Sequence, residues 1–216
     1  FLKDKPHLKM TTVGYRFQFP FAMSEFTFAL DPQAELLKKH PWLYAYKNNI
    51  VPKPGSGMFF IQGGICTYWY QAEVQAIQAY APVDCLGECL HNHNYLNNNC
   101  TDDTRGQNSF WYQKIGTMMQ YPYVFALENL GNSEWISERL YMALMVGAVP
   151  IYSGGEEGVL GYNKPMPERV LKMLPHRDAI VWMGDFRDAA HLGGFLQARV
   201  DDPALHYETH HRWRHS

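Results

Sequence analysis

The sequence predicts an α/β protein built on a Rossmann-like, doubly wound parallel sheet. Three observations support this fold class. Short apolar runs have the length of buried strands, at 58–62, 123–127 and 148–152. Helical stretches separate these runs, and strands that alternate with helices indicate parallel pairing. Apolar residues make up 46% of the 216-residue chain, which suffices to bury the core of one such domain.

The N-terminal quarter is expected to be a connector and the end of a preceding region. Residues 1–57 hold one helical stretch at 31–46, and Pro41 interrupts it. The turn-rich segment 53–57 then leads into the first apolar run. We therefore predict that the α/β domain occupies residues 58–216.

The first half of that domain is predicted to contain a strand, a helix and an insertion. The strand at 58–62 ends at Gly63-Gly64, where the backbone can approach a phosphate closely. An amphipathic helix is expected at 70–80. Residues 87–120 are polar and rich in Asn and His, which favours an inserted surface loop.

The stretch from 123 to 155 is the most informative part of the chain. It holds a buried strand, a polar loop that opens on Glu128 and Asn129, a helix and a second buried strand that ends in glycines (123–127, 128–132, 133–146 and 148–152). Such a βαβ unit holds phosphates, because the helix N-terminus offers N–H groups and a positive dipole end. The pattern predicts a nucleotide site, with Glu138 and Arg139 within reach of the ligand.

The C-terminal part is predicted to complete the sheet and cover it. A long loop at 158–175, with prolines and charges, leads to an apolar segment around 179–183. Two final helices are expected at 187–199 and 203–215.

Composition bounds the possible partners. The formal net charge of −2 leaves no excess of Lys and Arg for a broad basic face, so nucleic acid is not an expected partner. No run of about eighteen apolar residues occurs, so no segment is predicted to span a bilayer. The chain opens on Phe1-Leu2-Lys3 without a signal sequence, which reads as the interior of a larger protein.

The cysteines form a weak zinc pattern. Cys85 and Cys89 have Cys100 nearby, but no second close pair completes a site. Buried thiols or one or two disulfides are the preferred interpretation.

The histidines invite a metal interpretation as well, and we expect no metal site. His206 and His210 are spaced to share one face of a helix, and His211 follows them. No carboxylate completes a ligand set, so surface or terminus-stabilising histidines are expected.

The 123–155 stretch resembles the donor-binding signature of α-1,3-fucosyltransferases, glycosyltransferase family 10. The strings F-A-L-E-N, W-I-S-E-R-L and G-A-V-P are similar to the family's F-E-N, Y-V/I-T-E-K and A-G-A-V-P. Other stretches match in the same order, namely Tyr15-Arg16, Val83-Asp84 with Gly87 and Cys89, and Asp185-Phe186 followed by Tyr207 and Trp213.

The resemblance implies the donor-binding half of a two-domain GT-B enzyme. It implies inverting transfer of fucose from GDP-fucose to a glycan hydroxyl, in α-1,3 linkage to N-acetylglucosamine. The family needs no divalent metal for this step, and its catalytic base is a carboxylate upstream of this segment, so no base is assigned here. The full-length protein would lie in the Golgi lumen, held by an N-terminal membrane anchor absent from this chain.

The resemblance also implies roles for residues around the helix start. Glu138 matches the glutamate that binds the nucleotide ribose, and Arg139 takes the place of a lysine that pairs with the diphosphate. The alternative for both is an ordinary exposed helix side chain. Trp135 replaces a tyrosine and either stacks on the base or sugar or covers the core. Ser137 keeps the hydroxyl of the family's threonine.

Two more candidates come from the strand end itself. Glu128 and Asn129 follow strand 123–127 at its carboxyl edge, where open α/β sheets bind ligands. Asn129 either contacts the donor or braces the loop.

One departure from the family concerns the diphosphate. An arginine usually follows the first glycine turn, but residues 66–81 contain no Lys or Arg, and Tyr70 falls near the expected place. Arg16 or Lys114 is a possible substitute. Two alternative functions therefore stay open: a transferase that uses another sugar nucleotide on the same fold, and a non-catalytic nucleotide- or glycan-binding module.

Overall fold

The computed structural model describes most of the predicted α/β domain. The described residues are 58–60, 68–94, 117–118, 120–128, 138–145, 147–154, 161–174 and 176–212. The connector predicted at 1–57, the glycine pair at 63–64 and most of the 87–120 insertion lie outside these residues.

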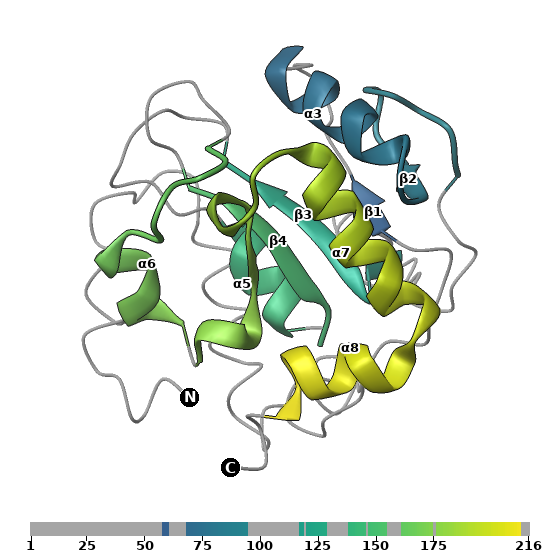
Figure 1. The fold of residues 1–216 in the computed structure, drawn as a ribbon. Coiled ribbons are helices and arrows are strands. Elements are labelled where there is room, and N and C mark those ends of the chain that lie inside the picture. Colours follow the sequence, from purple (N-terminus) through teal and green to yellow (C-terminus); the bar gives the residue numbers. More distant parts are fainter. Residues whose placement is uncertain are drawn as a thin grey trace, which may run out of the picture.

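A five-stranded sheet forms the centre of the described domain, in the order β2-β1-β3-β4-β5 (Figure 1). All four neighbouring pairs are parallel, which confirms the predicted fold class. The strands are β1 (Met58–Phe60), β2 (Val83–Cys85), β3 (Tyr123–Leu127), β4 (Val149–Ser153) and β5 (Val181–Trp182).

Helices cover both faces of this sheet. The longer ones are α3 (Tyr68–Gln78), α5 (Glu138–Met145), α6 (Glu168–Met173), α7 (Ala189–Asp201) and α8 (Pro203–His210). In β3, Phe125 packs in a core with side chains of α3 and α7, while Ala126 packs in a second core with α5 and α6. Successive strand residues point to opposite faces, so this alternation places the two helix pairs on opposite sides. Figure 1 shows α3 and α7 side by side.

The central strands are buried throughout, which explains why they read as continuous apolar runs. Every residue of β3 and β4 is buried. Parallel strands covered on both faces favour such unbroken runs of apolar side chains over alternation.

The two C-terminal helices begin at aspartate caps. Asp188 accepts a hydrogen bond of 2.8 Å from the backbone N–H of His191 at the start of α7. Asp202 accepts from two backbone N–H groups at the start of α8, and Pro203 occupies the first turn. Both helices were predicted, but α8 ends at His210 rather than at 215.

The sequence prediction was wrong for part of 158–175. This segment was predicted to be a loop, and it contains α6. Val170 and Leu174 are buried against the α5 side of the sheet, and Lys172 pairs with Glu168 at 2.7 Å on the exposed side. Prolines at 165, 167 and 175 interrupt the sequence pattern of this short amphipathic helix, so it was not recognised.

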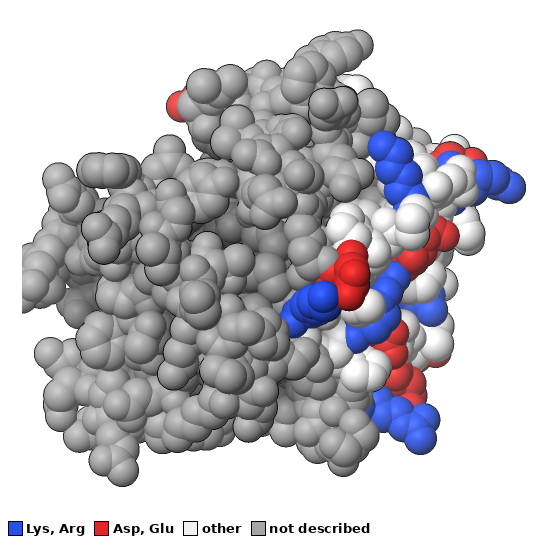
Figure 2. All heavy atoms as spheres, turned by 90° about the vertical axis from the view of Figure 1, so that its left-hand side faces the viewer, with Lys and Arg blue, Asp and Glu red and all other residues white. Residues whose placement is uncertain are grey.

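The described surface carries charges of both signs. Figure 2 shows Lys and Arg side chains interleaved with Asp and Glu over the described part of one face, without a patch of one sign. Among the described helices, none combines the length and apolar character that crossing a bilayer requires.

Candidate functional site

The strand order reverses between β1 and β3, and this point defines the candidate site. The chain moves from β1 outward to β2, and then returns to β3 on the other side of β1. At such a switch point the connections leave in opposite directions, so a crevice opens at the carboxyl ends of the two strands. Glu128 is the first residue after β3 and therefore lies at this edge.

Glu128 is held inside the protein rather than exposed at the edge. Its side chain is only 2% exposed, and its Oε1 accepts a hydrogen bond of 3.1 Å from the hydroxyl of Tyr152. Tyr152 belongs to β4 and pairs with Ala126 in the neighbouring strand. Because this carboxylate is buried and bonded, it stands at a fixed place at the carboxyl end of β3.

Arg139 folds back from α5 onto the end of β3. It is the second residue of α5, and its Nη1 donates a hydrogen bond of 2.5 Å to the carbonyl of Leu127, the last residue of β3. This arginine is half-buried, and its bond to Leu127 holds the guanidinium at the end of β3. A guanidinium carries five N–H groups in a planar fork, so a bond to one carbonyl is compatible with a second bond to a phosphate.

Tyr70, in the first turn of α3, is a third residue of the candidate site, after Glu128 and Arg139. Burial raises the pKa of Tyr70 to about 12, while the charge of Arg139 lowers this pKa and that of Glu128 raises it. The phenol therefore feels the charges of both groups. Tyr70 therefore contributes a neutral hydroxyl rather than a cation to this edge.

The structure therefore brings together two of the six predicted site residues, Glu128 and Arg139. Glu138 is the first residue of α5, on the same edge, and its side chain lies outside the described atoms. Asn129, Trp135 and Ser137 lie outside the described residues, so their predicted roles stay predictions.

Sequence reasoning missed two residues at this edge. Tyr152 read as a core residue of an apolar strand, and nothing in the sequence tied it to Glu128 24 positions earlier. Glu73 of α3 accepts a hydrogen bond from the hydroxyl of Tyr162, and burial raises the pKa of the Glu73 carboxyl to about 7. This bond fastens the loop after β4 to α3.

The cysteines follow the preferred interpretation. Cys85 is a free, buried thiol, and burial with the nearby charge of Asp84 raises its pKa to about 12. Cys89 is disulfide-bonded. A thiol with so high a pKa stays protonated and is a poor nucleophile or metal ligand.

The histidines near the C-terminal end were expected to be surface or terminus-stabilising side chains, and the surface interpretation was wrong. His206, His210 and His211 are each at most 3% exposed. His211 Nε2 lies 3.0 Å from His206 Nε2, and the ring of Tyr123 packs edge-on against His206 and His210. Across the described ranges, no three His, Cys, Asp or Glu side chains gather in a way that would hold a metal ion.

A known family matches the chain over most of this fold. The C-terminal model of glycosyltransferase family 10, the fucosyltransferases, matches residues 70–216. The chain belongs to this family. The matched residues 70–216 include most of α3, the site residues Glu128 and Arg139, and both C-terminal helices.

The relatives of this family 10 chain are named GDP-fucose protein O-fucosyltransferase 3. The protein of Mus musculus is 28% identical over 144 residues, which is 65% of this chain and 26% of the relative. That of Gallus gallus is 25% identical over 141 residues, and that of Xenopus laevis 36% over 81 residues. The Gallus gallus match covers 65% of this chain and 26% of the relative, and the Xenopus laevis match 38% and 16%. The chain thus spans about a quarter of the length of the first relatives.

Solved structures share the fold. An α1,3-fucosyltransferase with GDP superposes with a TM-score of 0.57 at 18% identity, over 85% of this chain and 46% of that chain. The same class of enzyme with GDP-fucose gives a TM-score of 0.56 at 17% identity, over 80% and 44%.

Proposed function

We propose that this chain is the donor-binding part of a fucosyltransferase that takes fucose from GDP-fucose and transfers it to an acceptor hydroxyl. The observation that carries the proposal is the position of Arg139. In a family 10 chain, this cation lies at the carboxyl edge of β3, beside the switch point of the sheet. Open α/β sheets bind nucleotides at such a point.

The transfer step needs a neutralised leaving group. When the bond from fucose to the diphosphate breaks, negative charge builds up on the phosphate oxygens, and a fixed cation stabilises it. Arg139 supplies that charge from a half-buried position, where water screens it less than at an open surface. Glu138, beside it, binds the ribose hydroxyls of the donor, and Glu128 braces the strand end beneath.

The acceptor is a hydroxyl group of a protein or of a glycan. The names of the relatives favour a protein hydroxyl. The second candidate, which the family resemblance implies, is α-1,3 transfer with inversion to N-acetylglucosamine of a glycan. The base that deprotonates this hydroxyl belongs to a part of the protein that precedes the donor-binding domain.

The setting follows from the same proposal. The disulfide at Cys89 supports an oxidising compartment, in keeping with a Golgi-lumen enzyme anchored through a segment outside this chain. No divalent metal takes part, because side-chain cations stabilise the diphosphate.

A transfer assay tests the proposal. The full-length protein, incubated with GDP-fucose and a panel of folded protein domains and N-acetylglucosamine-terminated glycans, is expected to release GDP and label one acceptor class. Arg139→Ala is expected to lower turnover about 10- to 100-fold, since a hydrogen bond to a charged group contributes roughly 1.5–3 kcal/mol. Arg212→Ala, an exposed arginine of the C-terminal end, is the control. Unchanged turnover in Arg139→Ala would reject the role of this arginine.

A further inference from the structure

The loop after β4 brings a lysine to the same edge of the sheet. Lys164 follows the described Gly161 and Tyr162, and its backbone N–H donates 3.0 Å to the carbonyl of Gly184 just after β5. It therefore stands at the carboxyl ends of β4 and β5, on the same edge of the sheet where Arg139 of α5 bonds to the end of β3.

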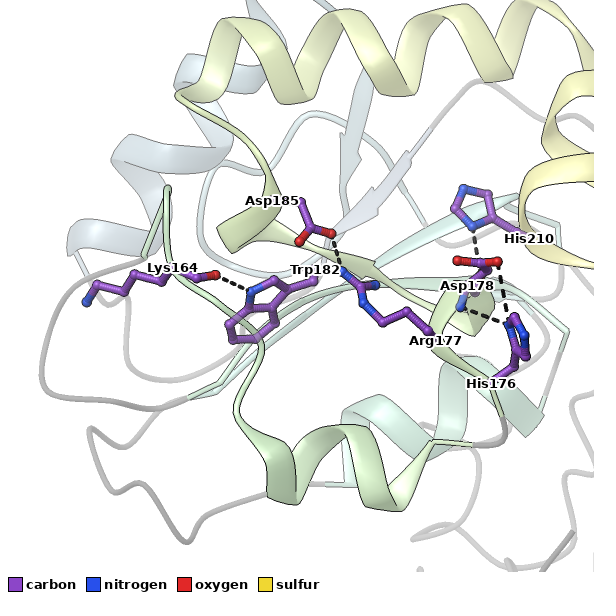
Figure 3. A network of polar contacts seen from close by, with 7 residues as sticks. All are labelled: Lys164, His176, Arg177, Asp178, Trp182, Asp185 and His210. Carbon is purple, nitrogen blue, oxygen red and sulfur yellow. Dashed lines mark hydrogen bonds and ion pairs between the residues drawn. The ribbon is translucent and has the colours of Figure 1, made fainter.

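The backbone of Lys164 is held on several sides. The indole Nε1 of Trp182 donates 2.7 Å to the Lys164 carbonyl, as Figure 3 shows. The preceding Asn163 adopts a left-handed φ of 54° and donates from its backbone N–H to the carbonyl of Phe186 at 2.9 Å. Tyr162 bonds to Glu73 of α3. These contacts fix the point from which the lysine side chain extends.

The side chain itself is exposed and carries an uncommitted charge. Its methylene stem lies over Gly161, where an added Cβ would be 2.4 Å from the lysine Cδ. Among the described residues, Lys164 takes part in no ion pair, whereas Lys172, Arg177, Arg187 and Arg212 each contact a carboxylate. In Figure 3 the side chain of Lys164 extends away from the polar network around Arg177.

Lys164 is one of the residues that line a small open hollow. Ser153 and Gly154, at the end of β4, form another wall of the hollow. Ser153 pairs in register with Leu127, whose carbonyl accepts the hydrogen bond from Arg139. The wall formed by Ser153 therefore lies on the strand next to β3, whose end Arg139 contacts.

We propose that Lys164 is the second cation of the diphosphate site. The inference rests on the proposed donor-binding function and assigns a residue that the family resemblance does not supply. A diphosphate carries more negative charge than one arginine neutralises, and residues 66–81, where the family resemblance leads us to expect a second cation, contain no Lys or Arg. Lys164 would supply that charge from the β4–β5 end of the edge, on a backbone that hydrogen bonds hold in place.

Binding of GDP and of GMP by calorimetry tests this assignment in the full-length protein. Lys164→Ala is expected to raise the dissociation constant for GDP about tenfold, because it removes one charge-assisted contact. The dissociation constant for GMP, which lacks the outer phosphate, should change less than about threefold. Lys164→Arg should restore GDP binding, and Lys172→Ala, a lysine of α6 already paired with Glu168, should leave it unchanged.

The outcomes separate this inference from the function on which it rests. If the wild-type protein binds GDP and Lys164→Ala binds it equally well, the second-cation role is wrong and the proposed function stands. An equal loss for GDP and GMP would likewise contradict a contact to the outer phosphate. If the wild-type protein binds no GDP, the proposed function fails together with this inference. Because the side chain of Lys164 is exposed, each variant is expected to keep the fold, and thermal melting checks this.

Discussion

The hydroxyl of Tyr152 donates a 3.1 Å hydrogen bond to the buried carboxylate of Glu128, and this bond ties β4 to the residue that follows β3. Tyr152 is fully buried, and its ring packs against Trp182 with centroids 6.1 Å apart. The pair therefore links three neighbouring strands at the edge where the donor is proposed to bind. A carboxylate there needs such a partner, because an unsatisfied buried charge destabilises the fold.

Tyr152→Phe removes this hydrogen bond and keeps the ring. We expect the free energy of unfolding to fall by about 1–3 kcal/mol, the cost of withdrawing a partner from a buried polar group. Urea denaturation measures the change. Tyr80→Phe makes the same chemical change at a tyrosine that is 52% exposed, and should be close to neutral. Equal stability of the two variants would mean that the bond to Glu128 contributes nothing.

Gly184 tests the contact that holds Lys164. A Cβ at this position would lie 2.0 Å from the Lys164 carbonyl oxygen and 2.2 Å from the Trp182 Nε1. Gly184→Ala is therefore expected to destabilise the protein by at least about 1–3 kcal/mol, the usual cost of overpacking, and to weaken GDP binding.

Gly194→Ala is the matched control for this substitution. A Cβ there meets nothing within 4 Å, and the residue lies inside α7. Alanine has the higher helix propensity, so this variant should gain about 0.5–1 kcal/mol. If both alanine variants melt at the same temperature, the packing around Gly184 is looser than the structure indicates.

The sheet was predictable from sequence because its central strands are continuous apolar runs that end in polar or glycine residues. β3 and β4 match the predicted runs almost residue for residue. Helix α6 could not be predicted from the sequence, because three prolines around it interrupt the helical pattern. Its formation depends on the burial of Val170 and Leu174 against the sheet, which local sequence does not reveal.

The buried side chain of His210 makes the free energy of unfolding depend on pH. Burial lowers the pKa of His210 to about 4, below its ordinary value of 6.5, although its bond to the Asp178 carbonyl opposes this shift. The charged and titratable groups around it are Asp178, Arg177, Arg199, Tyr123 and His206. The unfolded chain takes up a proton near pH 6.5 and the folded chain only near pH 4, so stability falls as pH decreases through this window.

His210→Gln removes that proton linkage. The stability advantage of the wild-type protein over this variant should shrink by about 3 kcal/mol between pH 7 and pH 4. Chemical denaturation at several pH values measures it. An advantage that stays constant across this range would show that His210 titrates normally in the folded protein.

Glu73 is expected to act in the opposite direction. Burial raises the pKa of its carboxyl to about 7, above its ordinary value of 4.5. The folded state therefore holds this proton more tightly, and the associated stability is lost as pH rises from about 4.5 through 7. Glu73→Gln, which cannot ionise, should gain thermal stability relative to the wild-type protein at pH 8 but not at pH 4. The exposed Glu88→Gln is the control, and a Glu73→Gln gain that does not vary with pH would contradict the shift.

The candidate site was only partly predictable, for a geometric reason. Glu128 and Arg139 could be named because both lie in one local βαβ motif. Tyr70 and Lys164 reach the same edge from 58 residues before Glu128 and 36 residues after it, counted from the residue numbers. Their approach depends on the strand order and on the loop contacts of Lys164, which no local pattern encodes.

A crystal structure of the full-length protein with GDP tests the central claim most directly. The account predicts the diphosphate at the carboxyl end of β3, with a phosphate oxygen within about 3 Å of the Arg139 guanidinium, the length of a charge-assisted hydrogen bond. A nucleotide bound away from this edge, or one whose phosphates make no contact with Arg139, would contradict it.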